Sequence, residues 1–274
     1  MATEIPATCG AAAHAAIEAQ FLDAVARGAE IVETPAFRVH LWPQPGPFYR
    51  NVAVPTRRPA DWQPAIAAMQ AAFVAAGRVP RLEYLQDRWP DLGPALDAAG
   101  LVETGRLRVM VTSDPPAAAP DGPPVRFMES APSQWHLEAY LLAVQEAFEQ
   151  STDPQALSEE LAQLRAEIAD GGCRIATIAA ADGSILAGAS LIGIGRSGPG
   201  PGSRIAELAG VWTAVAERGR GLATRVAAGL VDRFVAGGDA LVWLAAETER
   251  TAALYARLGF QPIGWQRNYS APAG

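Results

Sequence analysis

Glu217-Arg-Gly-Arg-Gly-Leu-Ala-Thr224 is a short, basic, glycine-rich stretch that lies between an apolar run and a segment with helical periodicity. Its two glycines permit bends that turn successive backbone N–H groups into one concavity. The helix that follows adds unpaired N–H donors and the positive end of its dipole. Arg218, Arg220 and Arg225 crowd into this region although the whole chain carries a net charge of −7. The stretch therefore predicts a phosphate-binding turn at the start of a helix.

The composition is that of a globular protein. At 274 residues, 50% hydrophobic and 19% charged, the chain is long enough for a full globular core. Its acidic balance argues against nucleic-acid binding, and no run reaches the roughly 18 apolar residues of a membrane span. We expect no signal peptide, and the isolated Cys9 and Cys173 predict no disulfide and a reducing, cytoplasmic setting. His14, His40 and His136 lie far apart in the sequence, so we expect no metal site.

Five prolines within residues 114–124 interrupt both helix and strand formation and predict an interdomain linker. The expected domains are therefore 1–113 and 125–274. In the second domain the periodicity predicts the order β-α-α-β-β-β-α-β-α-β, a mixed α/β sheet flanked by helices. The expected elements are a strand at 125–129, helices at 131–150 and 154–170, strands at 173–180, 185–194 and 205–213, a helix at 222–235, a strand at 240–245, a helix at 250–258 and a last strand pair within 260–269.

The two halves repeat one pattern at an offset of 159 residues. Residues 96–105 match residues 255–264 in type and spacing, and the strand-like stretch 81–85 falls on 240–244. At the glycine-rich turn the halves differ, because the first half has Pro59-Ala-Asp-Trp-Gln-Pro64, in which prolines remove N–H donors and no glycine permits the bend. We therefore expect the N-terminal half to be a degenerate copy without the phosphate site.

The C-terminal half resembles the GNAT superfamily of acetyl-CoA-dependent N-acetyltransferases. Arg218-x-x-Gly221-x-Ala223 fits the superfamily's Gln/Arg-x-x-Gly-x-Gly/Ala signature. Leu254-Tyr255-Ala-Arg-Leu-Gly259-Phe260 fits its later Leu-Tyr-x-x-Leu-Gly-Phe segment. Leu254 follows Ala223 by 31 residues, which suffices for one helix and one strand. The resemblance covers about residues 125–270 and implies a tandem GNAT-like fold, with the C-terminal copy intact.

The resemblance also implies roles for single residues. Tyr255 would protonate the departing thiolate, and Glu207 is the candidate base that takes a proton from the amine. Many members have an asparagine seven residues before the tyrosine; here Thr248 or its neighbour Glu247 takes over, or the contact is absent. The residues implied to hold coenzyme A are Val211, Trp212 and Thr213 along the pantetheine, and Arg218, Gly219, Arg220, Gly221, Leu222, Ala223 and Thr224 around the pyrophosphate.

The implied activity is transfer of an acetyl group from acetyl-CoA to a primary amine, on a small molecule or a peptide, in a ternary complex without a metal. The front half would close one side of the acceptor cleft or mediate packing between chains, which leaves a homodimer open. Structural alternatives remain: Glu207 as a solvated or salt-bridged carboxylate, and Tyr255 as a core aromatic residue. The alternative function is a non-catalytic acyl-CoA-binding sensor or interaction module.

Overall fold

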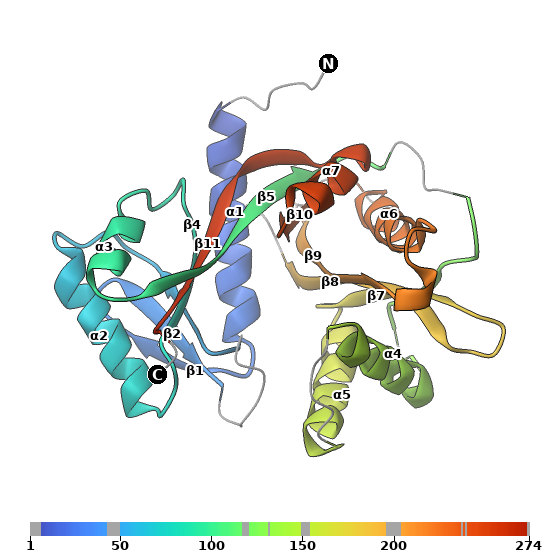
Figure 1. Cartoon of the computed structure of the whole chain (residues 1–274), viewed down its shortest axis with the longest axis horizontal. Coiled ribbons are helices and arrows are strands. Elements are labelled where there is room, and N and C mark those ends of the chain that lie inside the picture. The colour runs from blue at the N-terminus through green and yellow to red at the C-terminus, as the bar shows by residue number, and fades with distance from the viewer. Residues whose placement is uncertain are drawn as a thin grey trace. The chain divides into compact units, whose positions relative to one another are not determined.

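The computed structural model describes residues 7–42, 50–116, 121–130, 132–148, 154–195, 204–236, 238 and 240–272. The chain forms two compact units (Figure 1). The N-terminal unit comprises Met1–Met110, Ala245–Ala252 and Pro262–Gly274, and the C-terminal unit comprises Val111–Leu244 and Ala253–Gln261. The end of the chain thus groups with its first half. The domain limits expected at residues 114–124 stay a prediction.

In the N-terminal unit the strands follow the order β1-β2-β3-β4-β11-β5. β3 and β4 are parallel because the helix α2 crosses over between them, whereas β1, β2 and β3 pair antiparallel. The strands are β1 (Glu30–Glu33), β2 (Phe37–Leu41), β3 (Val52–Pro55), β4 (Arg81–Leu85), β5 (Val102–Thr112) and β11 (Gln261–Ser270), and the helices are α1 (Ala7–Ala26), α2 (Trp62–Ala75) and α3 (Leu92–Ala98).

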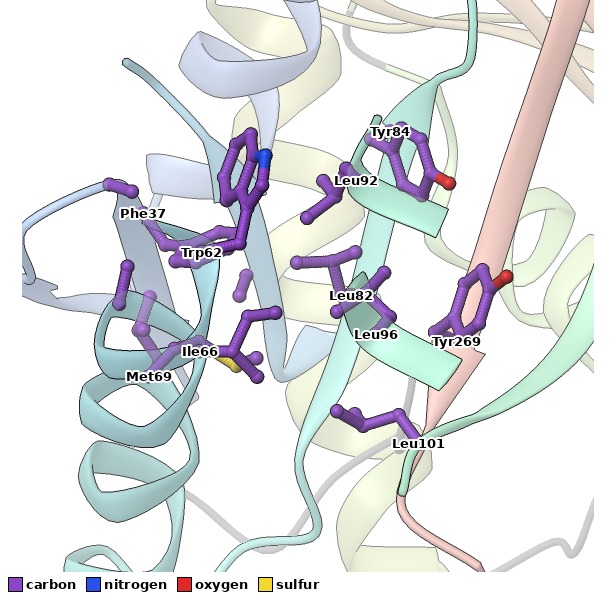
Figure 2. Packing of buried hydrophobic residues seen from close by; sticks show 14 of the residues in the cluster. Phe37, Trp62, Ile66, Met69, Leu82, Tyr84, Leu92, Leu96, Leu101 and Tyr269 are labelled. Atoms are coloured by element: carbon purple, nitrogen blue, oxygen red, sulfur yellow. The ribbon is translucent and has the colours of Figure 1, made fainter. Parts of the chain in front are cut away.

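The core of this unit lies where α2 and α3 pack on one face of the sheet (Figure 2). Cross-strand partners share a face, so Leu82 and Tyr269, which pair between β4 and β11, both point into this core. Trp62 packs edge-on against Trp89, with ring centroids 6.1 Å apart. Leu96 of α3 is fully buried in the same cluster. The last strand of the chain therefore contributes a fully buried aromatic ring to the N-terminal unit.

β11 corrects one expectation from the sequence. Residues 260–269 were expected to form a strand pair, but they form one continuous strand that pairs antiparallel with β4 from Gln266–Leu85 to Ser270–Arg81. Each residue of that stretch is matched to β4, so the chain has no room to reverse there. Hydrogen bonding to β4 replaces the hairpin that the local pattern suggested.

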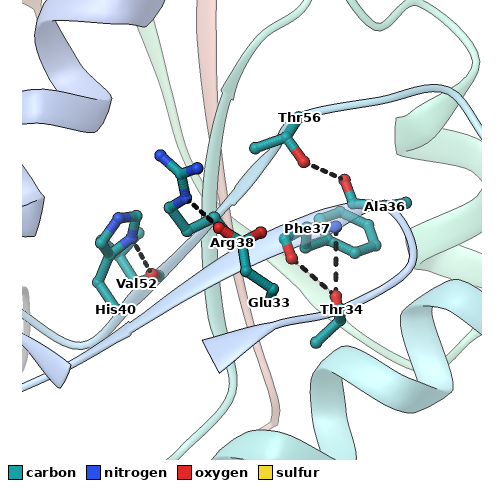
Figure 3. A network of polar contacts seen from close by, with 8 residues as sticks. All are labelled: Glu33, Thr34, Ala36, Phe37, Arg38, His40, Val52 and Thr56. Carbon is teal, nitrogen blue, oxygen red and sulfur yellow. Dashed lines mark hydrogen bonds and ion pairs between the residues drawn. The ribbon is translucent and has the colours of Figure 1, made fainter. Parts of the chain in front are cut away.

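The first hairpin of this unit is closed by side chains (Figure 3). The Thr34 hydroxyl donates to the carbonyl of Phe37 at 2.8 Å and accepts from its N–H at 3.2 Å. Thr56, directly after β3, donates to the carbonyl of Ala36 at 3.4 Å. These bonds tie the chain that leaves β3 toward α2 back to the β1–β2 turn.

In the C-terminal unit the strands follow the order β10-β9-β8-β7-β6, with α6 on one face and α4 and α5 on the other (Figure 1). The expected mixed sheet flanked by helices is confirmed, and the helix expected at 222–235 has those limits. The strands are β6 (Arg126–Met128), β7 (Arg174–Ala179), β8 (Ile185–Gly195), β9 (Arg204–Thr213) and β10 (Ala240–Ala246), and the helices are α4 (Gln134–Ala147), α5 (Pro154–Ala169) and α6 (Leu222–Val235). The helix α7 (Glu249–Arg257) is divided, because residues up to Ala252 group with the N-terminal unit and those from Ala253 with the C-terminal unit.

The expected repeat is visible in the order of the elements. β4, α3 and β5 follow one another in the first half as β10, α7 and β11 do in the second, and β4 and β10 start 159 residues apart. The strand of the second half that corresponds to β5 is thus β11, which lies beside β4 in the N-terminal unit. Among the helices of the described residues, none has both the length and the apolar composition that crossing a membrane requires.

Candidate active site

The glycine-rich turn has the backbone conformation that its sequence demands. β9 is followed by a 3-10 turn at Val215–Glu217, and then Gly219 and Gly221 adopt φ values of +83° and +76°. For L-residues, which carry a Cβ atom, this left-handed region costs roughly 1–2 kcal/mol. Gly221 is the N-cap of α6 and has no side chain to accept from the first N–H groups of the helix. The turn therefore presents backbone donors at a helix start.

The arginines of the turn have different partners. Arg218 lies 3.5 Å from the carbonyl of Thr213, the last residue of β9, and Arg220 forms an exposed ion pair with Glu217. Arg225 instead donates to the carbonyl of Pro123 at 2.6 Å, so it attaches the end of the proline-rich segment to α6. Arg218 and Arg220 are thus the arginines held at the turn itself.

β9 leaves its parallel neighbour before it reaches the turn. The pairing with β10 runs from Arg204–Ala240 to Glu207–Trp243, whereas β9 continues to Thr213. On its other edge β9 is irregular, because Ser190 of β8 pairs with Ala209 while Gly188 pairs with Trp212. β9 therefore has one extra residue there, a β-bulge that includes the left-handed Gly210 (φ +56°). Bulges of this kind redirect a strand.

The bulge decides which side chains share a face of the sheet. Successive strand residues alternate between faces, so Glu207 and Trp212 would point to opposite sides of a regular strand. With the extra residue, both face the same side as Ser190 and Ile192 of β8, and Ile192 packs against the cluster formed by α4 and α5. Glu207 is partly exposed on that face. The candidate base and the Trp212 side chain thus lie on the side covered by α4.

Tyr255 lies on α7, where its ring meets that of Phe260 edge-on at a centroid distance of 5.8 Å. Burial raises the pKa of the Tyr255 phenol to about 12, so it keeps its proton at neutral pH. At the start of α7, Thr248 accepts from the N–H of Thr251 at 3.1 Å, and the Thr251 hydroxyl accepts from the Thr248 N–H at 3.0 Å. Thr248 therefore caps α7, which gives this position a structural role.

The corresponding region of the N-terminal unit is built differently. Asp61 is the N-cap of α2, and its carboxylate accepts from the N–H of Gln63 at 2.9 Å. A second carboxylate, that of Asp91, accepts from the Trp62 indole at 2.8 Å and pairs with Arg58 at 3.0 Å. The carboxylate of Asp61 thus occupies the position at the start of α2 where a bound anion would otherwise lie. Leu96, at the position that matches Tyr255, is buried in the core (Figure 2).

The turn, β9, α6 and Tyr255 belong to one unit of the structure. Sequence reasoning missed the bulge, although Gly210 within an apolar run was the signal available, since an isolated glycine in a strand often marks a bulge. It also missed Tyr140 and Ser190, which lie behind the bulge. In the part of the chain that the structure describes, no three His, Cys, Asp or Glu side chains gather as metal ligands would.

Comparison with known proteins identifies the C-terminal unit. Residues 133–260 match the model of the acetyltransferase (GNAT) family. A GCN5-related N-acetyltransferase from Kribbella flavida is 22% identical, with 95% of this chain and 96% of that chain covered and a TM-score of 0.72. A GCN5-related N-acetyltransferase from Sphaerobacter thermophilus is 16% identical, with coverage of 87% and 82% and a TM-score of 0.62.

A tandem GNAT protein from the clavulanic acid biosynthesis pathway is also similar, at 16% identity, with 96% of this chain and 97% of that chain covered and a TM-score of 0.58. The sequence matches no curated protein. These likenesses extend the shared fold over nearly the whole chain, including its N-terminal half. Residues 133–260 therefore form an acetyltransferase (GNAT) domain, and the fold of the whole chain is that of a tandem GNAT protein.

Proposed function

We propose that the C-terminal unit binds acetyl-CoA and transfers its acetyl group directly to a primary amine in a ternary complex. One observation carries the proposal: α6 begins with two left-handed glycines and no capping side chain, directly after a strand that has left its parallel partner. This combination offers an anion site and an open strand edge next to each other. The N-terminal unit has an acidic cap at the matching helix and takes no part in binding the coenzyme.

The coenzyme would be held mainly by backbone groups. The pyrophosphate accepts from N–H groups of the turn, and the Arg218 and Arg220 side chains balance its charge. The pantetheine arm extends along Val211–Thr213 in the manner of an added strand, which places the thioester beside the bulge. The full set of proposed contacts is Val211, Trp212, Thr213, Arg218, Gly219, Arg220, Gly221, Leu222, Ala223 and Thr224.

The reaction forms a C–N bond and breaks the C–S bond of the thioester. The amine must lose a proton, and Glu207 accepts it directly or through a water molecule. The departing sulfur gains negative charge, and the Tyr255 phenol donates a hydrogen bond to it. Because a phenol of pKa about 12 is a weaker acid than a thiol, this hydrogen bond stabilises the departing thiolate without full transfer of the proton. Most of the rate acceleration would come from holding the amine against the thioester.

The proposal also covers the acceptor, the roles of the two domains and the compartment in which the protein works. The acceptor is a small molecule or a peptide that carries a primary amine, and neither nucleic acid nor membrane is a partner. Residues 1–113 and 125–274 act as the degenerate and the coenzyme-binding domain, joined by the linker 114–124. The protein works in the cytoplasm, either as one chain or as a homodimer in which the N-terminal domains pack together.

Thiol release from acetyl-CoA over a panel of primary amines tests the activity. Glu207→Gln and Tyr255→Phe should each lower kcat by about 10²- to 10⁴-fold, the range for general acid or base groups. Glu159→Gln, on the exposed side of α5, and Tyr84→Phe, in the N-terminal unit, are matched controls that should keep wild-type rates. Tight coenzyme A binding without turnover on any amine would favour the sensor. Turnover that both site variants leave unchanged would refute the proposed roles.

A further inference from the structure

A chain of buried hydroxyl groups supports the bulge of β9 from behind. Tyr140 of α4 is 5% exposed and Ser190 of β8 is 8% exposed. The Ser190 hydroxyl donates to the carbonyl of Ala209 at 3.1 Å and also forms a hydrogen bond with the Tyr140 hydroxyl. A Cβ atom on Gly210 would lie 3.4 Å from Ser190 Oγ and 4.0 Å from the Tyr140 hydroxyl. Both groups therefore reach the bulge itself.

The chain of hydroxyls ends on a backbone carbonyl at the point where the sheet is irregular. Ser190 and Ala209 are register partners, and the register shifts immediately after them. A bulge disrupts the regular hydrogen-bond ladder. The Ser190 side chain supplies a donor to a backbone carbonyl at this point. The rest of the Tyr140 side chain packs in an apolar cluster with Leu137 and Ile175, so its hydroxyl is a polar group in a hydrophobic environment.

Gly188 makes room for the other end of the bulge. A Cβ atom there would lie 2.8 Å from Trp212 Nε1 and 3.0 Å from Tyr140 Cε2, so the indole and the phenol ring both press against this glycine. Trp212 is 6% exposed. Tyr140 thus lies near both ends of the bulge, with its hydroxyl on the side of Gly210 and its ring beside Gly188, the register partner of Trp212.

We propose that Tyr140 and Ser190 are positioning residues of the acyl-CoA site, which fix the bulge and so set the direction in which Val211–Thr213 leaves the sheet. The inference rests on the proposed function, because it assigns the pantetheine arm to that segment. It predicts that the loss of either hydroxyl weakens coenzyme A binding although neither side chain touches the coenzyme.

Calorimetric titration with coenzyme A and with acetyl-CoA tests this without knowledge of the acceptor. Ser190→Ala and Tyr140→Phe should each raise the Kd of both ligands by roughly two- to tenfold, the value of an ordinary hydrogen bond. Since the two hydroxyls act as one chain, the double variant should bind about as weakly as Ser190→Ala alone. Thr177→Val removes a buried hydroxyl from β7, two strands from β9, and Tyr84→Phe does so in the N-terminal unit; both should leave the Kd unchanged.

The outcomes separate this inference from the function on which it rests. If wild-type protein binds coenzyme A and Ser190→Ala and Tyr140→Phe only lower the thermal midpoint, the hydroxyls are merely structural and the inference is wrong. Additive losses in the double variant would also contradict it, because independent effects exclude one chain. If wild-type protein binds neither ligand, the proposed function itself fails, and the inference falls with it.

Discussion

Gly219→Ala tests whether the left-handed backbone of the turn is used for binding. A Cβ atom at Gly219 would meet no atom within 4 Å, so the substitution adds no clash. Its only effect is backbone strain at φ +83°, about 1–2 kcal/mol for an L-residue. If the turn relaxes to relieve the strain, its N–H groups leave the anion-binding arrangement, and binding must restore them.

The strain energy then lowers the affinity of the protein for coenzyme A. A difference of about 1–2 kcal/mol corresponds to a coenzyme A Kd that is roughly 5- to 30-fold higher, measured by calorimetry. Gly183→Ala is the matched control, because Gly183 has a φ of +90°, has equally open space around it and lies in the turn between β7 and β8 of the same unit. Gly183→Ala should lose stability and keep wild-type affinity. If Gly219→Ala behaves in the same way, the conformation of the turn does not serve coenzyme binding.

Three further predictions concern the N-terminal unit. Asp61→Ala removes the cap of α2 and should lower the free energy of unfolding by about 0.5–2 kcal/mol in urea titrations. The affinity for coenzyme A should stay unchanged. Weaker binding would refute the claim that the N-terminal unit takes no part in binding the coenzyme. Ending the chain after residue 260 removes β11, so the amides of β4 should lose protection in hydrogen exchange; unchanged protection would contradict the pairing. The hydrogen bond from Arg267 holds the pKa of Glu103 in the folded protein below its ordinary value of 4.5. The carboxylate therefore stabilises the folded protein above pH 4.5, and this stability is lost as the pH falls through the lower pKa of the folded protein. Glu103→Gln should flatten the acid limb of a plot of thermal midpoint against pH, and an unchanged limb would show that the pair contributes nothing measurable.

Local signals in the sequence predicted local structure well. The limits of α6 follow from the glycine-rich turn and the apolar periodicity after it, and the structure confirms them. The repeat predicted the matching order of β4, α3 and β5 with β10, α7 and β11. Prolines and the absence of glycine at residues 59–64 predicted the loss of the phosphate site, and the structure adds the acidic cap formed by Asp61.

Long-range pairing could not be predicted in the same way. The sequence pattern of residues 261–270 indicates a strand but not its partner. It fits pairing with β4 as well as pairing with a neighbouring strand in a hairpin. Arg225 adds positive charge close in sequence to the turn, but its side chain bonds to the carbonyl of Pro123, about a hundred positions earlier. The shared face of Glu207 and Trp212 depends on one extra residue in β9, which an alternating pattern does not reveal. The roles of Glu207 and Tyr255 stay predictions.

The position of the pyrophosphate is the most direct test of the central claim. A crystal structure of the protein with coenzyme A should show the pyrophosphate against the backbone N–H groups of residues 218–224, at the start of α6, and one coenzyme per chain. A pyrophosphate bound at the start of α2, or anywhere away from residues 218–224, would contradict the account.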